Sequence, residues 1–488
     1  MTLVRVVTAS SLIVGMASFL VINSSYTASS AQPAGPRWLA GDHHVHSRYS
    51  VGWDRETDPP TPILAGDAIY PIAMNTLMGR RHGLDWMVST DHGGPNHSRV
   101  NRDYAYPELL EARIAVPDMV LFYGMEFDTP GADHSSIIVP HSEHEADSLF
   151  EIESRFAKRE PWPADDSWDT VPRMIEALEA MKSLPQPPIV IAHHPSRSAT
   201  DLGEYGSTEL AELRAWNDAA PHIAIGMEGS PGHQAAALKQ APLTSAEQND
   251  NSNAARGGYG RFPTMGGYDQ MTAQLGGFWD SMLAEGRRWW ITANSDSHVH
   301  WREGGSDFWP GEYSKTYILA NKDYHSILES FRQGRMFVTT GDLISELWVS
   351  VRSGASETDI GGALQIAAGD SVDVTVRFRQ PDVANFRGQT PEVKRVDLIA
   401  GPITGKVSDA STNTSPQTQV VARFDAEDWV KDGAYHEIRY RFDAVDGPMY
   451  LRLRGTNTTE LEPEPDARGE DPWQDLWFYS NPVFVELR

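Results

Sequence analysis

The sequence of 488 residues contains no cysteine, which excludes disulfide bonds and metal sites built on thiolates. Any metal ion must therefore be held by nitrogen and oxygen ligands. Basic residues are also scarce: 41 lysines and arginines stand against 67 aspartates and glutamates, and the formal net charge is -26. This deficit argues against nucleic acids and anionic membranes as partners, because both require a basic surface. An anionic small-molecule substrate stays open, because bound metal ions can reverse the local field.

Long hydrophobic runs are equally rare, and the one that stands out lies at the N-terminus. Arg5 supplies a positive start, Leu12–Ile22 is an apolar run, and Ser29–Ala31 has the small residues that a signal peptidase accepts. We therefore predict a secretory signal peptide over residues 1–31 and a secreted or periplasmic protein without stable membrane insertion after cleavage. An uncleaved N-terminal anchor is the alternative, although the run is short for a membrane span.

The order of the expected elements divides the rest of the chain in two. Over 38–343, short hydrophobic strands alternate with helical patterns, which predicts parallel strands joined by crossover helices. A distorted TIM-like barrel of the α/β class is the first expectation, and an open doubly wound sheet is the alternative. Over 344–488, hydrophobic residues alternate with period two, which predicts a C-terminal antiparallel β-sandwich domain.

Three local expectations accompany this division. The pattern over 271–288 predicts one helix. His141 and His144 lie in an acidic stretch that we expect to be a solvated loop. The stretch 229–267 is long, irregular and rich in glycine, alanine, asparagine and serine, and it is expected to be either a lid over the site or a surface insertion.

A pair of histidines, His44 and His46, follows the first predicted strand. Side chains two residues apart in extended chain point the same way, so both imidazoles can reach one point. Two neutral imidazoles side by side are typical of a transition-metal site. Further candidate ligands recur near the ends of later strands: His92, Glu126, His134, His194, Asp296 and His298. His134 is the exception among them, because it precedes its strand.

Eight candidate ligands exceed the needs of one four-coordinate ion, so we expect two or three divalent ions. Imidazole with carboxylate suits Zn, Mn or Fe(II) better than Mg or Ca. A carboxylate can bridge two cations, and Glu126 is the predicted bridge. Isolated His-x-His pairs are usually ordinary surface or core histidines, but recurrence at several strand ends favours a metal site.

Five motifs in chain order resemble those of the PHP (polymerase and histidinol phosphatase) superfamily: His44-Val45-His46, Thr90-Asp91-His92, Gly124-Met125-Glu126, His194-Pro195 and Ser295-Asp296-Ser297-His298. The resemblance covers about residues 38–340. Two further segments, Gly334–Gly341 and Tyr479–Val483, are most similar to a secreted branch that includes carbaryl-hydrolase-like enzymes.

The resemblance implies a role for each candidate ligand. A first ion would lie on His44, His46, Glu126 and Asp296, a second on Glu126, His134 and His194, and a third on His92 and His298. For the third ion, one more ligand is implied at a position where this sequence has Val51, which cannot bind a metal. Asp54 is the candidate replacement.

Residues beside the ligands are expected to contact substrate or to orient the ligands. His193 and Arg197 are predicted to contact substrate, and Arg48 is a further candidate, because arginine can hold a phosphate with two hydrogen bonds. For His193 the alternative is to support a metal ligand or to fill space in the core, and for the arginines it is surface ion pairs. Asp91 and Glu228 follow or end strands and are predicted to accept hydrogen bonds that hold ligand imidazoles in place.

The first functional hypothesis is a metal-dependent phosphoesterase that uses a metal-bridging hydroxide on a small exported substrate. The alternative is an amide, ester or carbamate hydrolase with the same site, and a third hypothesis is a non-catalytic metal-binding or carbohydrate-binding protein. The sequence has no Gly-x-Ser-x-Gly elbow that would indicate a serine nucleophile. Arginines or lysines facing the ions would favour phosphate, and an apolar wall would favour a neutral acyl substrate. The oligomeric state is not predicted.

Overall fold

The computed structural model describes residues 35–236, 262–467 and 469–488. The predicted signal peptide over 1–31 lies outside the described residues, as does most of the predicted lid or insertion over 229–267. Residues Pro36–Arg488 form one unit. Within the described ranges, every helix is too short or too polar to cross a lipid bilayer.

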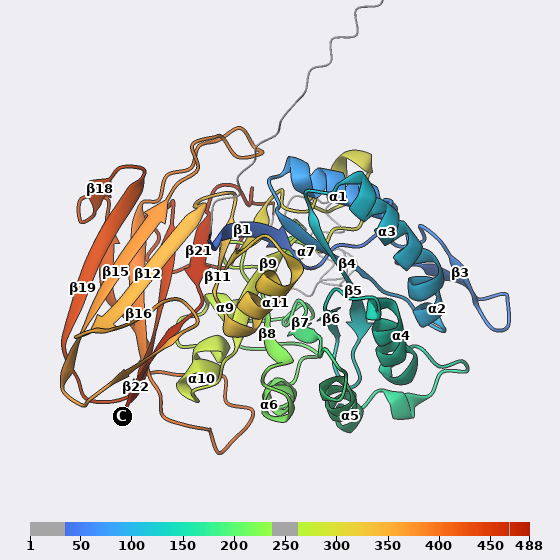
Figure 1. Ribbon diagram of the computed structural model, residues 1–488, viewed down its shortest axis with the longest axis horizontal. Helices are drawn as coiled ribbons and strands as arrows, with labels where there is room; N and C mark the ends of the chain where they lie inside the picture. Colours follow the sequence, from blue (N-terminus) through green and yellow to red (C-terminus); the bar gives the residue numbers. More distant parts are fainter. Residues whose placement is uncertain (1–34, 237–261, 468) are drawn as a thin grey trace, which may run out of the picture. The chain divides into compact units, whose positions relative to one another are not determined.

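The helices and strands follow in chain order (Figure 1). The helical elements are α1 (Ile72–Arg81), α2 (His97–Val100), η1 (Asn101–Ala105), α3 (Tyr106–Ala115), α4 (Glu145–Phe156), η2 (Asp166–Trp168), α5 (Val171–Lys182), α6 (Leu210–Ala219), α7 (Gly232–Ala236), α9 (Gln270–Ala273), α10 (Phe278–Ala284), η5 (Trp301–Glu303) and α11 (Tyr324–Gln333). The strands of the N-terminal part are β1 (Arg37–Asp42), β2 (Gly52–Asp54), β3 (Thr61–Ile63), β4 (Trp86–Asp91), β5 (Val120–Asp128), β6 (His134–Ile138), β7 (Ile189–Ala192), β8 (Ala224–Pro231), β9 (Trp290–Asn294), β10 (Ser314–Ala320) and β11 (Met336–Thr340). The later strands are β12 (Glu346–Ser353), β13 (Ser356–Thr358), β14 (Ala363–Ile366), β15 (Asp370–Arg379), β16 (Arg395–Pro402), β17 (Gln419–Asp425), β18 (Val430–Asp432), β19 (Tyr435–Val445), β20 (Met449–Thr456), β21 (Trp477–Ser480) and β22 (Val483–Leu487).

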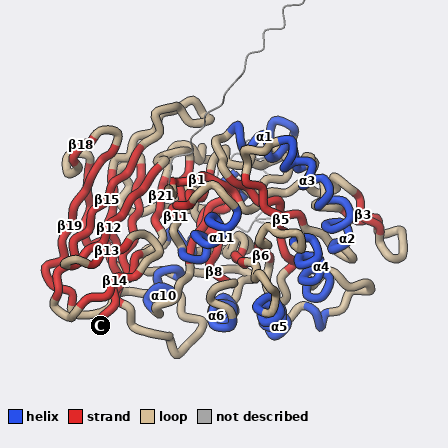
Figure 2. Tube along the Cα trace, viewed as in Figure 1, coloured by secondary structure: helices blue, strands red, loops and turns tan. Residues whose placement is uncertain are grey.

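The fold is mixed α/β, with a large sheet of parallel and antiparallel strands and a separate antiparallel sheet (Figure 2). In the large sheet, β1, β4, β5, β6, β7, β8 and β9 are neighbours in that order. The pairs β1–β4, β4–β5, β7–β8 and β8–β9 are parallel, as the alternation of strands and helices predicts. Strands β4 and β5 are buried along their whole length, which matches their near-continuous hydrophobic sequence.

Two strands of the large sheet, β6 and β10, do not have the predicted parallel pairing. β6 pairs antiparallel with both β5 and β7, and β10 pairs antiparallel with β1. The link from β5 to β6 is too short to hold a crossover helix, so the chain turns back on itself. This reversal has a direct consequence for the site, because the start of β6 lies at the same edge of the sheet as the ends of β5 and β7.

The two ends of the strand row approach each other at β10. The backbone N–H of Ala293 in β9 donates to Oγ1 of Thr316 in β10 at 2.7 Å, and the same hydroxyl donates back to the carbonyl of Ala293 at 2.8 Å. Among the described residues no backbone ladder joins β9 to β10. A side chain therefore connects the two strands where a closed sheet would have main-chain pairs.

The C-terminal part shows the predicted period-two strands, and some of them extend the large sheet. β21 pairs with β11, and β20, β22, β14 and β16 continue from it. Strands β13, β12, β15, β19 and β18 form the separate antiparallel sheet. The fully buried Arg452 of β20 binds Asp280 of α10 at 2.7 Å. The predicted division near residue 343 is thus crossed by a shared sheet and by a buried ion pair.

One local prediction is wrong. The expected helix over 271–288 is two short helices, α9 and α10, separated by Gly276 at a φ of 70°. Left-handed backbone ends a helix, and glycine adopts it without steric cost. His141 and His144 are exposed in the loop before helix α4, as expected, whereas Glu145 and Glu153 of α4 itself are buried.

Candidate metal centre

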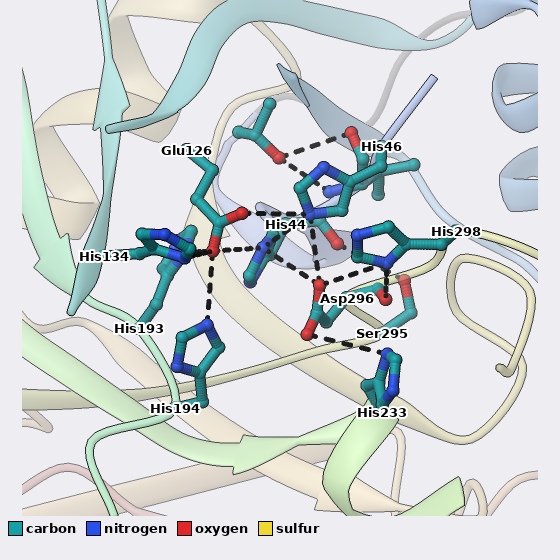
Figure 3. Close-up of polar contacts among 12 residues, drawn as sticks. His44, His46, Glu126, His134, His193, His194, His233, Ser295, Asp296 and His298 are labelled. Atoms are coloured by element: carbon teal, nitrogen blue, oxygen red, sulfur yellow. Dashed lines mark hydrogen bonds and ion pairs between the residues drawn. The ribbon is translucent and has the colours of Figure 1, made fainter. Parts of the chain in front are cut away.

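The predicted ligands meet at one edge of the large sheet (Figure 3). His44 and His46 follow β1, Glu126 lies near the end of β5, and Asp296 follows β9. His134 joins them because β6 runs antiparallel, so its first residue lies at the edge where neighbouring strands end. The chain direction of β6 therefore explains why a candidate ligand at the start of its strand lies beside those at the ends of other strands.

The first group of ligands is His44, His46 and Asp296, all buried. The Nε2 atoms of the two histidines lie 2.9 Å apart, and each is 3.1 Å from Oδ1 of Asp296. The other nitrogen of each ring is used elsewhere: His44 Nδ1 donates to Glu228 at 2.7 Å and His46 Nδ1 donates to Ser50 at 2.8 Å. Both Nε2 atoms thus converge on one point, where a cation could bind both.

The second group is Glu126, His134 and His194. Oε1 of Glu126 lies 2.8 Å from His134 Nδ1 and 3.2 Å from His194 Nε2. The same carboxylate also faces the first group, at 3.4 Å from His44 Nε2 and 3.5 Å from His46 Nε2. Glu126 therefore lies between the two groups, as expected of a residue that bridges two ions.

The third group contains His46, His92 and His298, and the structure supplies a carboxylate that the sequence analysis missed. Oδ2 of Asp67 lies 2.8 Å from His92 Nε2 and 3.7 Å from His298 Nε2. Asp54, the expected replacement for Val51, instead accepts the backbone N–H of Glu56 at 2.9 Å. Asp67 is thus the carboxylate that faces both imidazoles.

The electrostatics of the centre suit a cation. Burial opposes ionisation, yet the nearby imidazoles of His134 and His44 hold the pKa of Glu126 well below its usual range. The pKa of Asp296 is also held well below its usual value, because the imidazoles of His44, His46 and His298 outweigh the effect of burial. Burial lowers the pKa of His134, but Glu126 and Asp128 raise it to about 9. Ionised carboxylates beside imidazoles are a donor set that fits divalent transition metals. The imidazoles must lose their extra protons when a metal binds.

Two ligands also have left-handed backbone. His194 has a φ of 22° and Asp296 a φ of 51°. Such conformations cost on the order of 1 kcal/mol or more for residues other than glycine, and they gather at functional sites. The surrounding hydrogen bonds must hold both residues in place.

Three buried carboxylates hold the candidate ligands and their backbone in place. Glu228 accepts the His44 ring N–H through one oxygen and the backbone N–H of His194 at 2.5 Å through the other. Asp91 acts on His46 indirectly, because it accepts a hydrogen bond from Ser50, which itself accepts from the His46 ring. The third carboxylate was not predicted.

This third carboxylate is Asp42. Its Oδ1 accepts the backbone N–H of His44 at 3.1 Å, and its Oδ2 accepts that of Ser295 at 3.0 Å. Asp42 thereby ties the first ligand loop to the last. Gly41 precedes it because a Cβ there would lie 1.9 Å from the ring of Trp86.

A cleft of about 680 Å³ opens onto the ligands, and two arginines line it. Arg197 was predicted to contact substrate, and its guanidinium pairs with Asp133 at 3.1 Å. Arg159 was missed, and it pairs with Asp128 at 2.6 Å. Arg48 lies apart from the residues that line the cleft, bound to Glu108 with Nε at 3.0 Å.

His193 is placed differently from the prediction of a substrate contact. Its side chain is buried and is not among the residues that line the cleft. Nδ1 donates to Glu126 at 2.9 Å, and the ring stacks on His44 with centroids 3.6 Å apart. His193 therefore lies behind Glu126.

One more histidine belongs to the wall of the cleft. His233, on α7, has Nδ1 2.9 Å from Asp307, whose other oxygen accepts the backbone N–H of His298 at 2.6 Å. Sequence reasoning missed His233, Asp307, Asp67 and Arg159 because each lies in a loop or short helix without a strand-end motif. Only their residue types, all suited to metal or phosphate, gave a signal.

Comparison with known proteins adds no assignment. A scan against models of protein families gives no match, and a search of curated proteins gives none either.

Proposed function

We propose that the protein is a metal-dependent phosphoesterase of the PHP superfamily, built on a distorted TIM-like barrel that β1 and β4 to β10 form. Two lines of support are the order of the ligand motifs along the chain and their meeting at one sheet edge. Two ions, one on each of the two groups between which Glu126 lies, are the minimum that this donor set suggests, and Asp67 with His92 and His298 suits a third. Zn, Mn and Fe(II) match the mixture of imidazole and carboxylate.

The observation that carries the choice of phosphate is the pair of arginines in the cleft. Arg159 and Arg197 line the same cavity as His134, His194 and Asp296. Guanidinium groups match the geometry of phosphate oxygens and keep their charge at any working pH. A neutral acyl substrate carries no anionic group in its ground state for two such groups to bind.

The residues of the chain divide the work in this proposal. When bound, adjacent ions lower the pKa of a water molecule and offset charge on the phosphoryl oxygens. Arg159 and Arg197 orient the phosphoryl group, and Glu126 keeps the two ligand groups at a fixed separation. Asp307 fixes His233 on the cleft wall, where its ring can donate a hydrogen bond to substrate.

A second candidate, hydrolysis of an amide, ester or carbamate, is supported by a different part of the cleft wall. Val51, Trp53 and Val299 give it an apolar stretch that could hold an aromatic or alkyl group. The same stretch can hold the organic part of a phosphoester, so we rank this candidate second. A non-catalytic metal-binding or carbohydrate-binding protein is the third. Export of the protein remains part of the proposal.

The test is elemental analysis of the purified protein, followed by assays with the metal restored. We expect hydrolysis of p-nitrophenyl phosphate or of a nucleotide, which His44→Ala abolishes. Arg159→Gln and Arg197→Gln should each raise KM about 10- to 100-fold, the range for a hydrogen bond to a charged group. Arg48→Gln is the matched control and should leave KM unchanged. Turnover of naphthyl carbamates or esters alone would instead establish the second candidate, and a metal-loaded protein without turnover would support the third.

A further inference from the structure

A line of buried hydrogen bonds runs from Glu126 into the interior of the large sheet. His193 Nδ1 lies 2.9 Å from Glu126 Oε1, and His193 Nε2 lies 2.5 Å from Ser136 Oγ. Ser136 Oγ is 2.9 Å from His43 Nδ1, and His43 Nε2 is 2.8 Å from Thr292 Oγ1. All five side chains are at most 2% exposed. We call this line the interior chain. The proposed phosphoesterase function gives no role to three of its members, Ser136, His43 and Thr292.

The direction of each hydrogen bond follows from counting hydrogens. The carboxylate of Glu126 only accepts, so His193 Nδ1 carries the hydrogen. Nε2 of the neutral ring then accepts the single hydroxyl hydrogen of Ser136. Ser136 in turn accepts from His43 Nδ1, and His43 Nε2 accepts from Thr292. The competing acceptor for the Ser136 hydroxyl, the carbonyl of His43, is farther away at 3.2 Å.

We propose that the interior chain fixes His193 as its Nδ1–H tautomer and that His193 is a positioning residue that orients the bridging carboxylate of Glu126. Stacking on His44 prevents the His193 ring from turning, because the rings lie within 20° of parallel. The residues come from β5, β6, β9 and the loops after β1 and β7, so the orientation of Glu126 depends on five neighbouring segments of the sheet. This inference rests on the proposed metal centre.

A competing arrangement makes His193 itself a metal ligand, because His44, Glu126 and His193 also lie close enough to share an ion. Nδ1 would then have to lose its hydrogen, and Nε2 would carry it and donate to Ser136. The hydrogen bond from His193 to Glu126 would be lost, and every other hydrogen bond of the interior chain would be reversed. The two arrangements therefore predict different results when a side-chain amide replaces His193. An amide can replace a hydrogen-bond donor to Glu126, but it cannot replace a metal ligand.

The decisive variants are His193→Asn and His193→Gln. The amide nitrogen of asparagine takes the position of Nδ1 and can donate to Glu126, but an amide is a poor ligand for a transition metal. The amide nitrogen of glutamine takes the position of Nε2 and leaves Glu126 without this donor. Ser136→Ala removes the hydroxyl that fixes the tautomer. Ser330→Ala is its control, because Ser330 on α11 is also buried and donates to the carbonyl of Leu319 in β10 at 2.8 Å.

The measurements are metal content after dialysis, affinity by competition with a chromophoric chelator, and the visible spectrum of the Co²⁺-loaded protein. We expect His193→Asn to keep the full metal content and the wild-type spectrum, with affinity lowered less than about 3-fold. His193→Gln and His193→Ala should lose about 10- to 100-fold in affinity, and Ser136→Ala about 10-fold, as is usual when a support of a metal ligand is removed. Ser330→Ala should match the wild type.

The outcomes separate this inference from the proposed function. Loss of one whole ion in His193→Asn, with an altered spectrum, would make His193 a ligand and overturn the inference alone. Wild-type affinity in all His193 and Ser136 variants would overturn it as well. A wild-type protein that takes up no transition metal would overturn both the inference and the proposed function.

Discussion

Glu228→Gln is the sharpest perturbation that the centre offers, because one buried carboxylate supports a ligand in each of two groups. Its Oε1 accepts from His44 Nδ1 at 2.7 Å and its Oε2 accepts the backbone N–H of His194 at 2.5 Å. Glutamine has nearly the same shape but only one accepting oxygen. Whichever way the amide turns, its NH₂ group must face another N–H donor, so one of the two supports is lost.

The magnitude follows from the burial of this pair of hydrogen bonds. Glu228 is 0% exposed, so water cannot satisfy the donor that is left over. An unsatisfied buried donor costs about 1–3 kcal/mol, and each 1.4 kcal/mol is a factor of ten in a binding constant. We expect the metal affinity to fall about 10- to 100-fold. The assay is competition with a chromophoric chelator at fixed pH, which resolves the successive ions.

Glu212→Gln is the matched control. Glu212 is buried to 2% exposure on α6, but neither of its carboxylate oxygens has a hydrogen-bond partner among the described residues. The same substitution there should leave metal affinity unchanged. Wild-type affinity in Glu228→Gln would refute the reasoning, as would an equal loss of affinity in Glu212→Gln, which would point to a general effect on the fold.

Three further predictions follow from the charges. Burial raises the pKa of Glu212 from 4.5 to about 8, so its contribution to stability is complete below pH 4.5 and is lost as the pH rises to 8. In thermal unfolding from pH 5 to 8, Glu212→Gln should therefore flatten the pH dependence and stabilise the protein by on the order of 3 kcal/mol at pH 7. His134, with its pKa near 9, and His44, with its pKa well above the usual value, must lose protons to bind an ion. Metal loading at pH 7 should thus release protons, measurable by calorimetry in buffers of different ionisation enthalpy, and affinity should rise with pH up to about 9; pH-independent affinity would contradict this. Asp67→Asn should lower affinity only for the most weakly held ion, by about 10-fold or more, and an unchanged metal titration would exclude Asp67 as a ligand.

Much of the centre could be predicted because the physics of strand ends is local. A histidine pair with one residue between, or a carboxylate at the end of a hydrophobic run, is visible within a few residues of sequence. Parallel pairing then brings such ends to one edge, as it does for His46, His92, His194 and Asp296. The position of His134 could be explained only once the direction of β6 was known. The short link after Asp128 sets that direction, because it forces β6 to run antiparallel to β5.

The parts that could not be predicted depend on which distant residues the loops and helices contact in the folded protein. Asp67 follows the β2–β3 hairpin, and no spacing rule connects it with His92 or His298. The burial of two acidic residues in helix α4 was not predicted either. Glu145 is bound by Arg113, and Glu153 by His97 at 2.6 Å, and these tertiary partners cannot be read from the sequence around the helix.

The balance of charge in the cleft bears on how ions and the proposed substrate would bind. Each arginine already has an aspartate partner, so Arg159 and Arg197 give the cleft no net positive charge. The carboxylates of Glu126, Asp296 and Asp67 are offset in part by the protons on His134 and His44, which metal binding would release. Two divalent ions would more than cancel the three carboxylate charges, and a third would add to the excess. Under the proposed function, a phosphoester would therefore bind best after the ions, with the ions to attract it and the arginines to orient it, which would reconcile an acidic protein with an anionic substrate.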